Sequence, residues 1–295
     1  MYETPSHIKT IFKLNLERKE RTYTTEISTS ITRNNKTTFN NIAEEFTITF
    51  IKTVGELYVF RKIVKKRFFL NEINFVIKKL NKVQELALKL ASINDNLEFH
   101  VNKHFQLIKV GNTNEIRKKW GILRLEVLEK YPDLKKMIED FDIQLEEKYI
   151  QKVYLEDNFL TLLFSNLFNK KLDEKIPIEE NKLIANAIGT IDIPIIEKKL
   201  IIKNRNLFSK SINIKTTAEL DEENKKFPLA KLNNFIGKLN TKIGSKHKLN
   251  FEYNGKYNIL SEKSFVSEAE LVYTFEVEGL YKKISTFNFK LEEDE

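Results

Sequence analysis

The tripeptide Lys79-Leu80-Asn81 recurs unchanged as Lys231-Leu232-Asn233, 152 positions further along the chain. Three more identities keep this offset: Leu97 with Leu249, Phe99 with Phe251, and Asn102 with Asn254. Repeated segments of this kind usually fold as related units that pack on one another. We therefore expect an α+β fold with two related β-rich lobes, each arranged roughly strand–strand–helix–strand–strand.

The elements around the repeated residues fit that arrangement. In the first copy, alternating apolar and polar residues predict strands within 8–70, and helical spacing predicts a helix over 71–93. A hairpin should follow, with a three-residue loop at 102–104 that keeps Phe99, Phe105 and Leu107 on one face.

The second copy predicts the same order. Strands are expected at 190–203 and 207–217, before a helix whose apolar face carries Leu232, Phe235, Leu239 and Ile243. Asn254-Gly255 is a typical turn pair, so we expect a second hairpin with a loop at 254–256. Further strands are expected at 268–278 and 282–291.

Between the copies the pattern changes to helical spacing. Helices are expected from Thr113 or Asn114 to the residue before Pro132, from Asp133 to Leu145, and over 156–171 and 179–186. The predicted domains are an N-terminal lobe at 1–111, a helical insertion at 112–188 and a C-terminal lobe at 189–295.

Composition limits the classes of protein that remain. The chain has 295 residues, 41% of them hydrophobic, and a net charge of +8. It has no cysteine, which excludes disulfides, thiolate nucleophiles and Cys-based metal sites. No secretory signal and no run of eighteen apolar residues is present, so we expect a soluble, cytoplasmic protein without a membrane span. The abundance of Lys, Asn, Ile and Phe is typical of AT-rich bacterial or phage genomes.

Catalytic motifs are missing from the sequence. His100 and His104 have the i, i+4 spacing of a zinc-binding helix, but Val101 stands where the glutamate base is needed, so two surface histidines are the simpler interpretation. The glycines form no phosphate-binding loop, and no serine lies in a nucleophile elbow. Pairs of carboxylates such as Asp140 with Asp142 are common on helix surfaces. We therefore expect no catalytic residue, cofactor or metal, and no enzyme activity.

One segment concentrates positive charge. Five cations fall within seven residues, directly before Phe68-Phe69: Arg61, Lys62, Lys65, Lys66 and Arg67. Such a segment is a candidate contact for an anionic partner, since cations can hold a phosphate backbone while aromatic rings stack on bases. The alternative is an exposed strand edge, where lysines discourage pairing with other chains.

Trp120, the single tryptophan, is a candidate interface anchor, with anchoring of the core as the simpler alternative. The leading hypothesis for function is a non-enzymatic scaffold or adaptor in a bacterial or phage multiprotein assembly, with other proteins or a second copy as partner. One alternative is nucleic-acid binding through Arg61–Arg67. Another is an apolar-ligand carrier, with the ligand between sheet faces lined by Phe99, Phe105, Phe251 and Tyr257.

Overall fold

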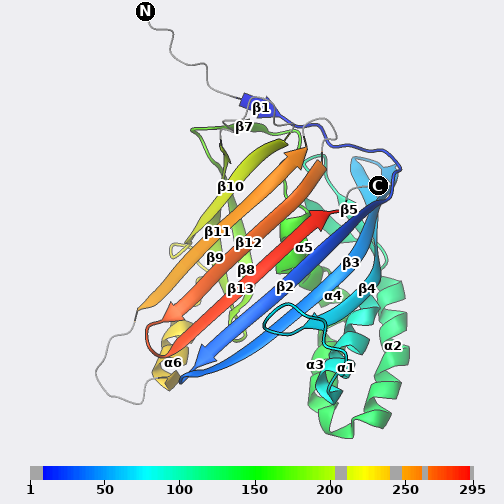
Figure 1. Cartoon of the computed structure of the whole chain (residues 1–295), viewed down its shortest axis with the longest axis vertical. Helices are drawn as coiled ribbons and strands as arrows, with labels where there is room; N and C mark the ends of the chain where they lie inside the picture. The colour runs from blue at the N-terminus through cyan, green and yellow to red at the C-terminus, as the bar shows by residue number, and fades with distance from the viewer. Residues whose placement is uncertain (1–8, 203–210, 240–247, 261–264, 293–295) are drawn as a thin grey trace, which may run out of the picture. The chain divides into compact units, whose positions relative to one another are not determined.

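The computed structural model describes residues 9–202, 211–239, 248–260 and 265–292. Within them the protein is α+β, as predicted, with six α-helices and one large antiparallel sheet. The eleven strands of that sheet follow the order β6-β5-β4-β3-β2-β13-β12-β11-β10-β9-β8 (Figure 1). A separate two-stranded sheet pairs β1 with β7.

The elements have the following bounds. The strands are β1 (Lys9–Ile11), β2 (Arg21–Arg33), β3 (Lys36–Val54), β4 (Leu57–Leu70), β5 (Asn96–Val101), β6 (Leu107–Val110), β7 (Lys171–Asp173), β8 (Ile178–Ile188), β9 (Ile191–Ile202), β10 (Ser211–Leu220), β11 (Leu249–Leu260), β12 (Phe265–Val277) and β13 (Tyr281–Leu291). The helices are α1 (Lys82–Ala91), α2 (Thr113–Lys130), α3 (Lys135–Gln144), α4 (Glu147–Leu155), α5 (Asn158–Leu163) and α6 (Leu229–Leu239).

The chain divides into two compact units. Unit 1 contains Met1–Asn15, Glu26–Asn41 and Leu167–Leu291, and unit 2 contains Leu16–Thr25, Ile42–Asn166 and Glu292–Glu295. Strands β2 and β3 contribute residues to both units, because the division crosses each of them.

Unit 1 holds long, regularly paired strands. Burial alternates residue by residue along β12 from Glu268 to Val277, so one face of the sheet carries a continuous apolar core. Aromatic rings build much of it: Phe251 stacks on Phe275 at 4.8 Å, and Tyr273 lies 5.8 Å from Phe287. Helix α6 adds to this unit through Phe235, whose ring meets Tyr281 edge to face at 5.1 Å.

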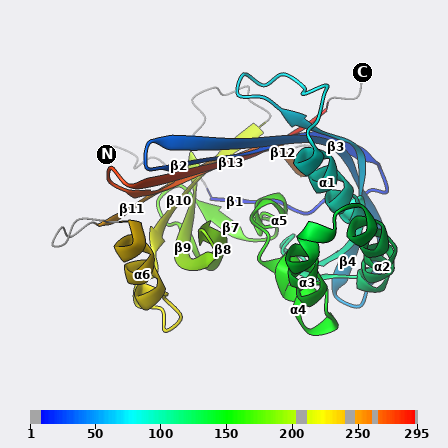
Figure 2. The same cartoon turned by 90° about the horizontal axis from the view of Figure 1, so that it is seen from below.

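Unit 2 combines β4, β5 and β6 with helices α1 to α5. Its core centres on Phe99, a fully buried β5 residue whose ring lies 4.8 Å from that of Phe164. Helices α2, α3 and α4 lie together, as Figure 2 shows. The predicted β5–β6 hairpin is confirmed, although its loop spans residues 102–106, with Phe105 at a φ of +61°.

The prediction of a second hairpin, with a loop at 254–256, is wrong. Residues 254–256 lie in the middle of β11, which pairs without a turn from Leu249 to Leu260. Gly255 serves close packing there, since a Cβ would lie 3.2 Å from the Glu270 carbonyl oxygen and 3.3 Å from Thr216 Cβ.

Duplicated lobes are accordingly not evident in the structure. One supposed copy has a hairpin where the other has a single strand. The helix faces also differ: Val83 is exposed, whereas its counterpart Phe235 packs on Tyr281. Ile243, the last residue of that predicted face, lies outside the described residues.

Several helix predictions also need correction. The helix expected over 71–93 begins only at Lys82, because the side chain of Asn81 caps it. The helix expected over 156–171 is instead α5 alone, capped by Asp157 and preceded by α4. Residues 179–186 belong to strand β8, which pairs with β9.

Candidate functional site

The connection between β4 and α1, together with the first residues of α1, carries a group of exposed apolar side chains in unit 2. We call residues 71–83 the 71–83 segment, and Figure 2 shows its first part as a cyan loop standing clear of α1. Ile73, Phe75 and Val83 are 72%, 68% and 74% exposed, and Val76 is also exposed. Single exposed apolar residues are common, but four within eleven positions of one segment form a patch of the kind found at interaction sites.

Backbone hydrogen bonds hold this patch in place. Asn71 Oδ1 accepts from the backbone N–H of Ile73 at 3.1 Å and of Phe75 at 2.9 Å. Asn74 adopts the left-handed conformation, with a φ of 60°, which Asn tolerates better than most residues. Ile77 N–H then bonds the carbonyl oxygen of Phe69 at 2.9 Å. The exposed side chains therefore project from a fixed turn.

The far end of the segment is fixed by the start of α1. Asn81 Oδ1 accepts from Val83 N–H and Gln84 N–H, while Gln84 Oε1 accepts from Asn81 N–H, which completes a capping box. Sequence periodicity alone assigned 71–81 to the helix. Asn71, Asn74 and Asn81, three residues favoured at turns and caps, were the signal against that assignment.

Three lysines accompany the apolar side chains. Lys78, Lys79 and Lys82 are exposed, and among the described residues none of them forms an ion pair. Glu72 is the segment's one acidic residue, so its net charge is +2. The segment thus joins apolar groups with uncompensated positive charge.

The predicted basic segment Arg61–Arg67 has the opposite character, because all five of its cations have carboxylate partners in unit 2. The ion pairs are Arg61–Glu98, Lys62–Glu44, Lys65–Glu20, Lys66–Glu45, and Arg67 with both Glu44 and Asp95. Burial by itself would raise the pKa of Glu44, but the charges of Lys62 and Arg67 outweigh it and hold that pKa below its ordinary value. Nearby carboxylates therefore offset the positive charge of Arg61–Arg67.

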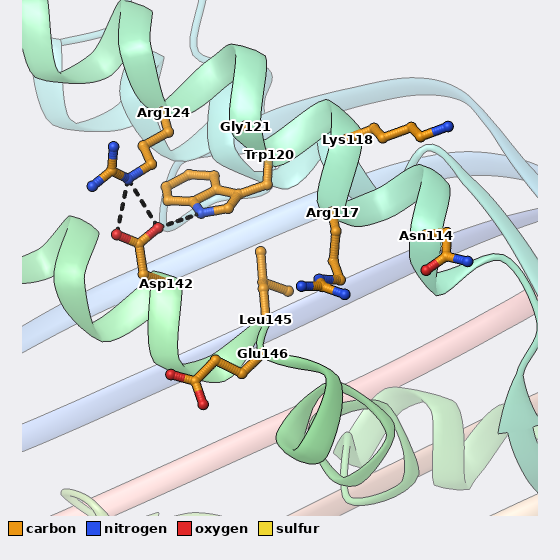
Figure 3. A pocket seen from close by; sticks show the side chains of 9 residues that line it. All are labelled: Asn114, Arg117, Lys118, Trp120, Gly121, Arg124, Asp142, Leu145 and Glu146. Atoms are coloured by element: carbon orange, nitrogen blue, oxygen red, sulfur yellow. Dashed lines mark hydrogen bonds and ion pairs between the residues drawn. The ribbon is translucent and has the colours of Figure 1, made fainter.

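Trp120 is 4% exposed and belongs to the core of the helical part of unit 2. Its indole N–H donates to Asp142 Oδ1 at 2.8 Å, and its ring lies 5.3 Å from that of Phe141. It also lines an open pocket of about 520 Å³ between α2 and the C-terminal end of α3 (Figure 3).

The aromatic residues predicted to line a ligand space are packed within their own units. Phe99 and Phe105 both contact the ring of Phe164 in unit 2. In unit 1, Phe251 stacks on Phe275, and Tyr257 is 1% exposed. Phe99 and Tyr257 are core residues, and Phe105 and Phe251 are half-buried.

Unit 1 buries a network of charges on one face of its sheet. Glu197, which is 1% exposed, accepts a hydrogen bond of 2.5 Å from the Tyr253 hydroxyl and lies within 3.1 Å of both Lys182 and Lys199. Burial would raise the pKa of Glu197, but the two lysines lower it to about 2. Lys199 also pairs with Glu180 at 3.1 Å, so two lysines face two carboxylates, and this balance accounts for the burial of the network.

Two further observations concern chemistry that the sequence left open. His100 lies 3.3 Å from Glu98, and no group of three or more potential ligands gathers within metal-binding distance in the described part of the chain. Among the described residues, no helix combines the length and the apolar character needed to cross a bilayer.

Comparison with known proteins gives no family. No family model matches the sequence, and no curated protein matches it. Among solved structures, the chain resembles one titled "Lipid-protein interactions in lipovitellin", with a TM-score of 0.48 and 9% identity. That match covers 95% of this chain but 26% of the other, so the chain spans about a quarter of that protein. A likeness at this level supports no statement about function.

Proposed function

We propose that this is a non-enzymatic binding protein that attaches to the surface of anionic membranes through the 71–83 segment. The observation that carries the proposal is the joint exposure of Ile73, Phe75, Val76 and Val83 beside three lysines that form no ion pair with any described residue. Interfacial attachment combines the same two elements, since apolar side chains enter the boundary of the acyl chains while cations meet anionic headgroups.

The expected energies are sufficient for reversible attachment. Burying a large apolar side chain is worth about 1.5–3 kcal/mol, so Ile73 and Phe75 together would contribute several kcal/mol. Each lysine near an anionic surface adds about 1 kcal/mol. Because the turn is already held by Asn71, little conformational entropy is lost when it binds.

The other predicted functions differ in their support. A scaffold or adaptor role in a multiprotein assembly remains a prediction, and the same exposed patch would suit a protein partner. Nucleic-acid binding through Arg61–Arg67 is weakened by the carboxylate that accompanies each cation. Carriage of an apolar ligand between the sheet faces is less favoured, because the aromatic rings named for it pack on neighbouring rings.

Vesicle co-sedimentation tests the proposal. The intact protein should sediment with vesicles that contain phosphatidylglycerol and remain in solution with vesicles of phosphatidylcholine alone. Ile73→Asn/Phe75→Asn should weaken binding at least tenfold, since about 1.4 kcal/mol corresponds to a factor of ten. Lys78→Glu/Lys79→Glu should weaken it by a similar factor, and added salt should weaken binding of the unaltered protein.

Matched control variants distinguish binding through the 71–83 segment from nonspecific adsorption to vesicles. Ile176→Asn removes an apolar side chain that is 68% exposed in unit 1, and Lys135→Glu/Lys136→Glu reverses two exposed charges on α3. Both variants should bind vesicles like the unaltered protein. Absence of binding to anionic vesicles would refute the proposal. So would binding to single-stranded DNA alone, or a protein partner lost with the 71–83 variants in the absence of any vesicle binding.

A further inference from the structure

A pocket in unit 2 is lined by two helices of opposite chemical character. Asn114, Arg117, Lys118, Gly121 and Arg124 come from α2, while Asp142, Leu145 and Glu146 come from α3 and the turn after it. Figure 3 shows Arg117, Trp120 and Leu145 around a common space, with the Arg124–Asp142 ion pair at one end. Its volume of about 520 Å³ lies in the range of sites for small molecules.

Gly121 keeps this pocket open. It lies in the middle of α2, where glycine lowers helix stability relative to alanine. A Cβ built on Gly121 would meet no atom within 4 Å, so the glycine does not serve close packing against another element. The effect of the missing side chain is open space beside Trp120.

The charges of the pocket leave a positive excess. Asp142 is neutralised by Arg124, whose Nε lies 3.0 and 2.8 Å from its two carboxylate oxygens, and it also accepts from Trp120. Glu146 lies 3.4 Å from Lys148. Arg117 has only a 4.0 Å approach to the exposed Glu147, and Lys118 has no ion pair among the described residues. Two cations therefore remain available at the rim.

The base of the pocket is apolar. Trp120 and Leu145 are 4% and 6% exposed, so each reaches the pocket through a small part of its side chain. Because the indole N–H is already bonded to Asp142, what Trp120 offers a ligand is ring surface.

We propose that this pocket binds a small organic anion, a carboxylate or phosphate ester attached to a flat apolar group. The apolar group touches the small accessible parts of Trp120 and Leu145, and the anionic group meets Arg117 and Lys118. This site is separate from the 71–83 segment, and neither proposal depends on the other.

Trp120 fluorescence tests the proposal directly, because it is the only tryptophan in the chain. Phenyl phosphate should change its emission in a saturable way, whereas inorganic phosphate and the neutral benzyl alcohol should each bind at least tenfold more weakly. Arg117→Ala/Lys118→Ala should lower the affinity for phenyl phosphate at least tenfold. Lys119→Ala, an exposed neighbour that does not line the pocket, should leave it unchanged.

A second variant removes the space and keeps the fold. Gly121→Leu should fill the pocket and abolish binding while the thermal midpoint stays equal or rises, since leucine favours the helix. The affinity of Gly121→Ala for phenyl phosphate should lie between those of the unaltered protein and of Gly121→Leu. Saturable binding that survives Gly121→Leu, equal affinity for inorganic phosphate, or no response of Trp120 to phenyl phosphate would each overturn the proposal. Vesicle binding by the same variants should stay normal.

Discussion

Lys62 Nζ and Glu44 Oε2 lie 2.9 Å apart, and their side chains are 6% and 12% exposed. The ammonium group also lies 4.7 Å above the ring of Phe46. Lys62 is therefore held by a carboxylate on one side and an aromatic face on the other. In a segment chosen from the sequence for its charge, this lysine is part of the core.

Replacing Lys62 with alanine should destabilise the protein strongly. Removing one partner of a buried ion pair costs about 3–5 kcal/mol, and we expect the lower end because Arg67 still bonds Glu44. Urea denaturation measures the difference. Lys66→Ala is the control, since its pair with Glu45 is exposed and should contribute less than about 1 kcal/mol. Equal stabilities of the two variants would show that the Lys62–Glu44 pair contributes nothing beyond a surface pair.

Sequence alone could locate the cations of Arg61–Arg67 but not their partners. Glu44 and Glu45 lie on β3, Glu98 lies on β5 and Asp95 lies just before it, so these pairings depend on the register of the strands. Glu20, the partner of Lys65, lies just before β2. Alternation does predict that Arg61 and Lys62 face opposite sides of β4, and Lys62 falls on the buried side. Local charge density was therefore a poor guide to surface potential here.

Several strands were predictable from the sequence, whereas strand β8 and the absence of a turn within β11 were not. Period-2 alternation correctly indicated β12 and β13, because burial on one face imposes it. The Asn254-Gly255 pair has the composition of a turn, yet Gly255 is needed where β10, β11 and β12 approach closely. The preference of Asn-Gly for turns was overridden by packing contacts with residues distant in sequence.

The 71–83 segment shows a similar limit. Apolar residues at helical spacing predict a buried helix face, and Leu86 and Leu90 do provide one. Phe75 shares that spacing but is exposed, because Asn81 starts the helix six positions after it. Val83 lies inside α1 and is exposed as well. The site thus lies where the periodic pattern and the capping signals disagree.

Glu197 should make stability depend on pH in the acidic range. Its pKa of about 2 lies below the ordinary value of 4.5, so its contribution is fully present above pH 4.5 and is lost as the pH falls toward 2. Glu197→Gln should cost about 3–5 kcal/mol at neutral pH, because Lys182 and Lys199 lose their shared carboxylate. Urea denaturation measures the free energy of unfolding of the unaltered protein and of Glu197→Gln. The difference between these two free energies should become smaller below pH 4.5.

The control for Glu197 is Glu219→Gln. Glu219 pairs with Lys198 in the same unit but is 57% exposed, so the substitution should change stability by less than about 1 kcal/mol at any pH. Two results would contradict a stabilising role for the ionised Glu197 carboxylate. One is unchanged stability of Glu197→Gln, and the other is a difference in free energy of unfolding that does not vary with pH.

Gln151 should protect the free side of strand β6. This strand is at one end of the sheet, and its last residue, Val110, bonds the Gln151 side chain through both backbone groups. Val110 N–H donates to Gln151 Oε1 at 2.9 Å, and Gln151 Nε2 donates to the Val110 carbonyl oxygen at 2.8 Å. The amide of Gln151 thus occupies the place of a neighbouring strand, where an uncovered edge would invite pairing with another chain.

Gln151→Ala should cost about 1–3 kcal/mol, because two partly buried backbone groups lose their partners. Hydrogen exchange measured by NMR gives the more specific readout: the Val110 amide should exchange roughly tenfold faster, since about 1.4 kcal/mol corresponds to a factor of ten. Gln144→Ala, an exposed substitution on α3, should leave that amide unchanged. If Val110 stays equally protected in Gln151→Ala, the edge is covered by α4 packing as a whole, and the side-chain hydrogen bonds are dispensable.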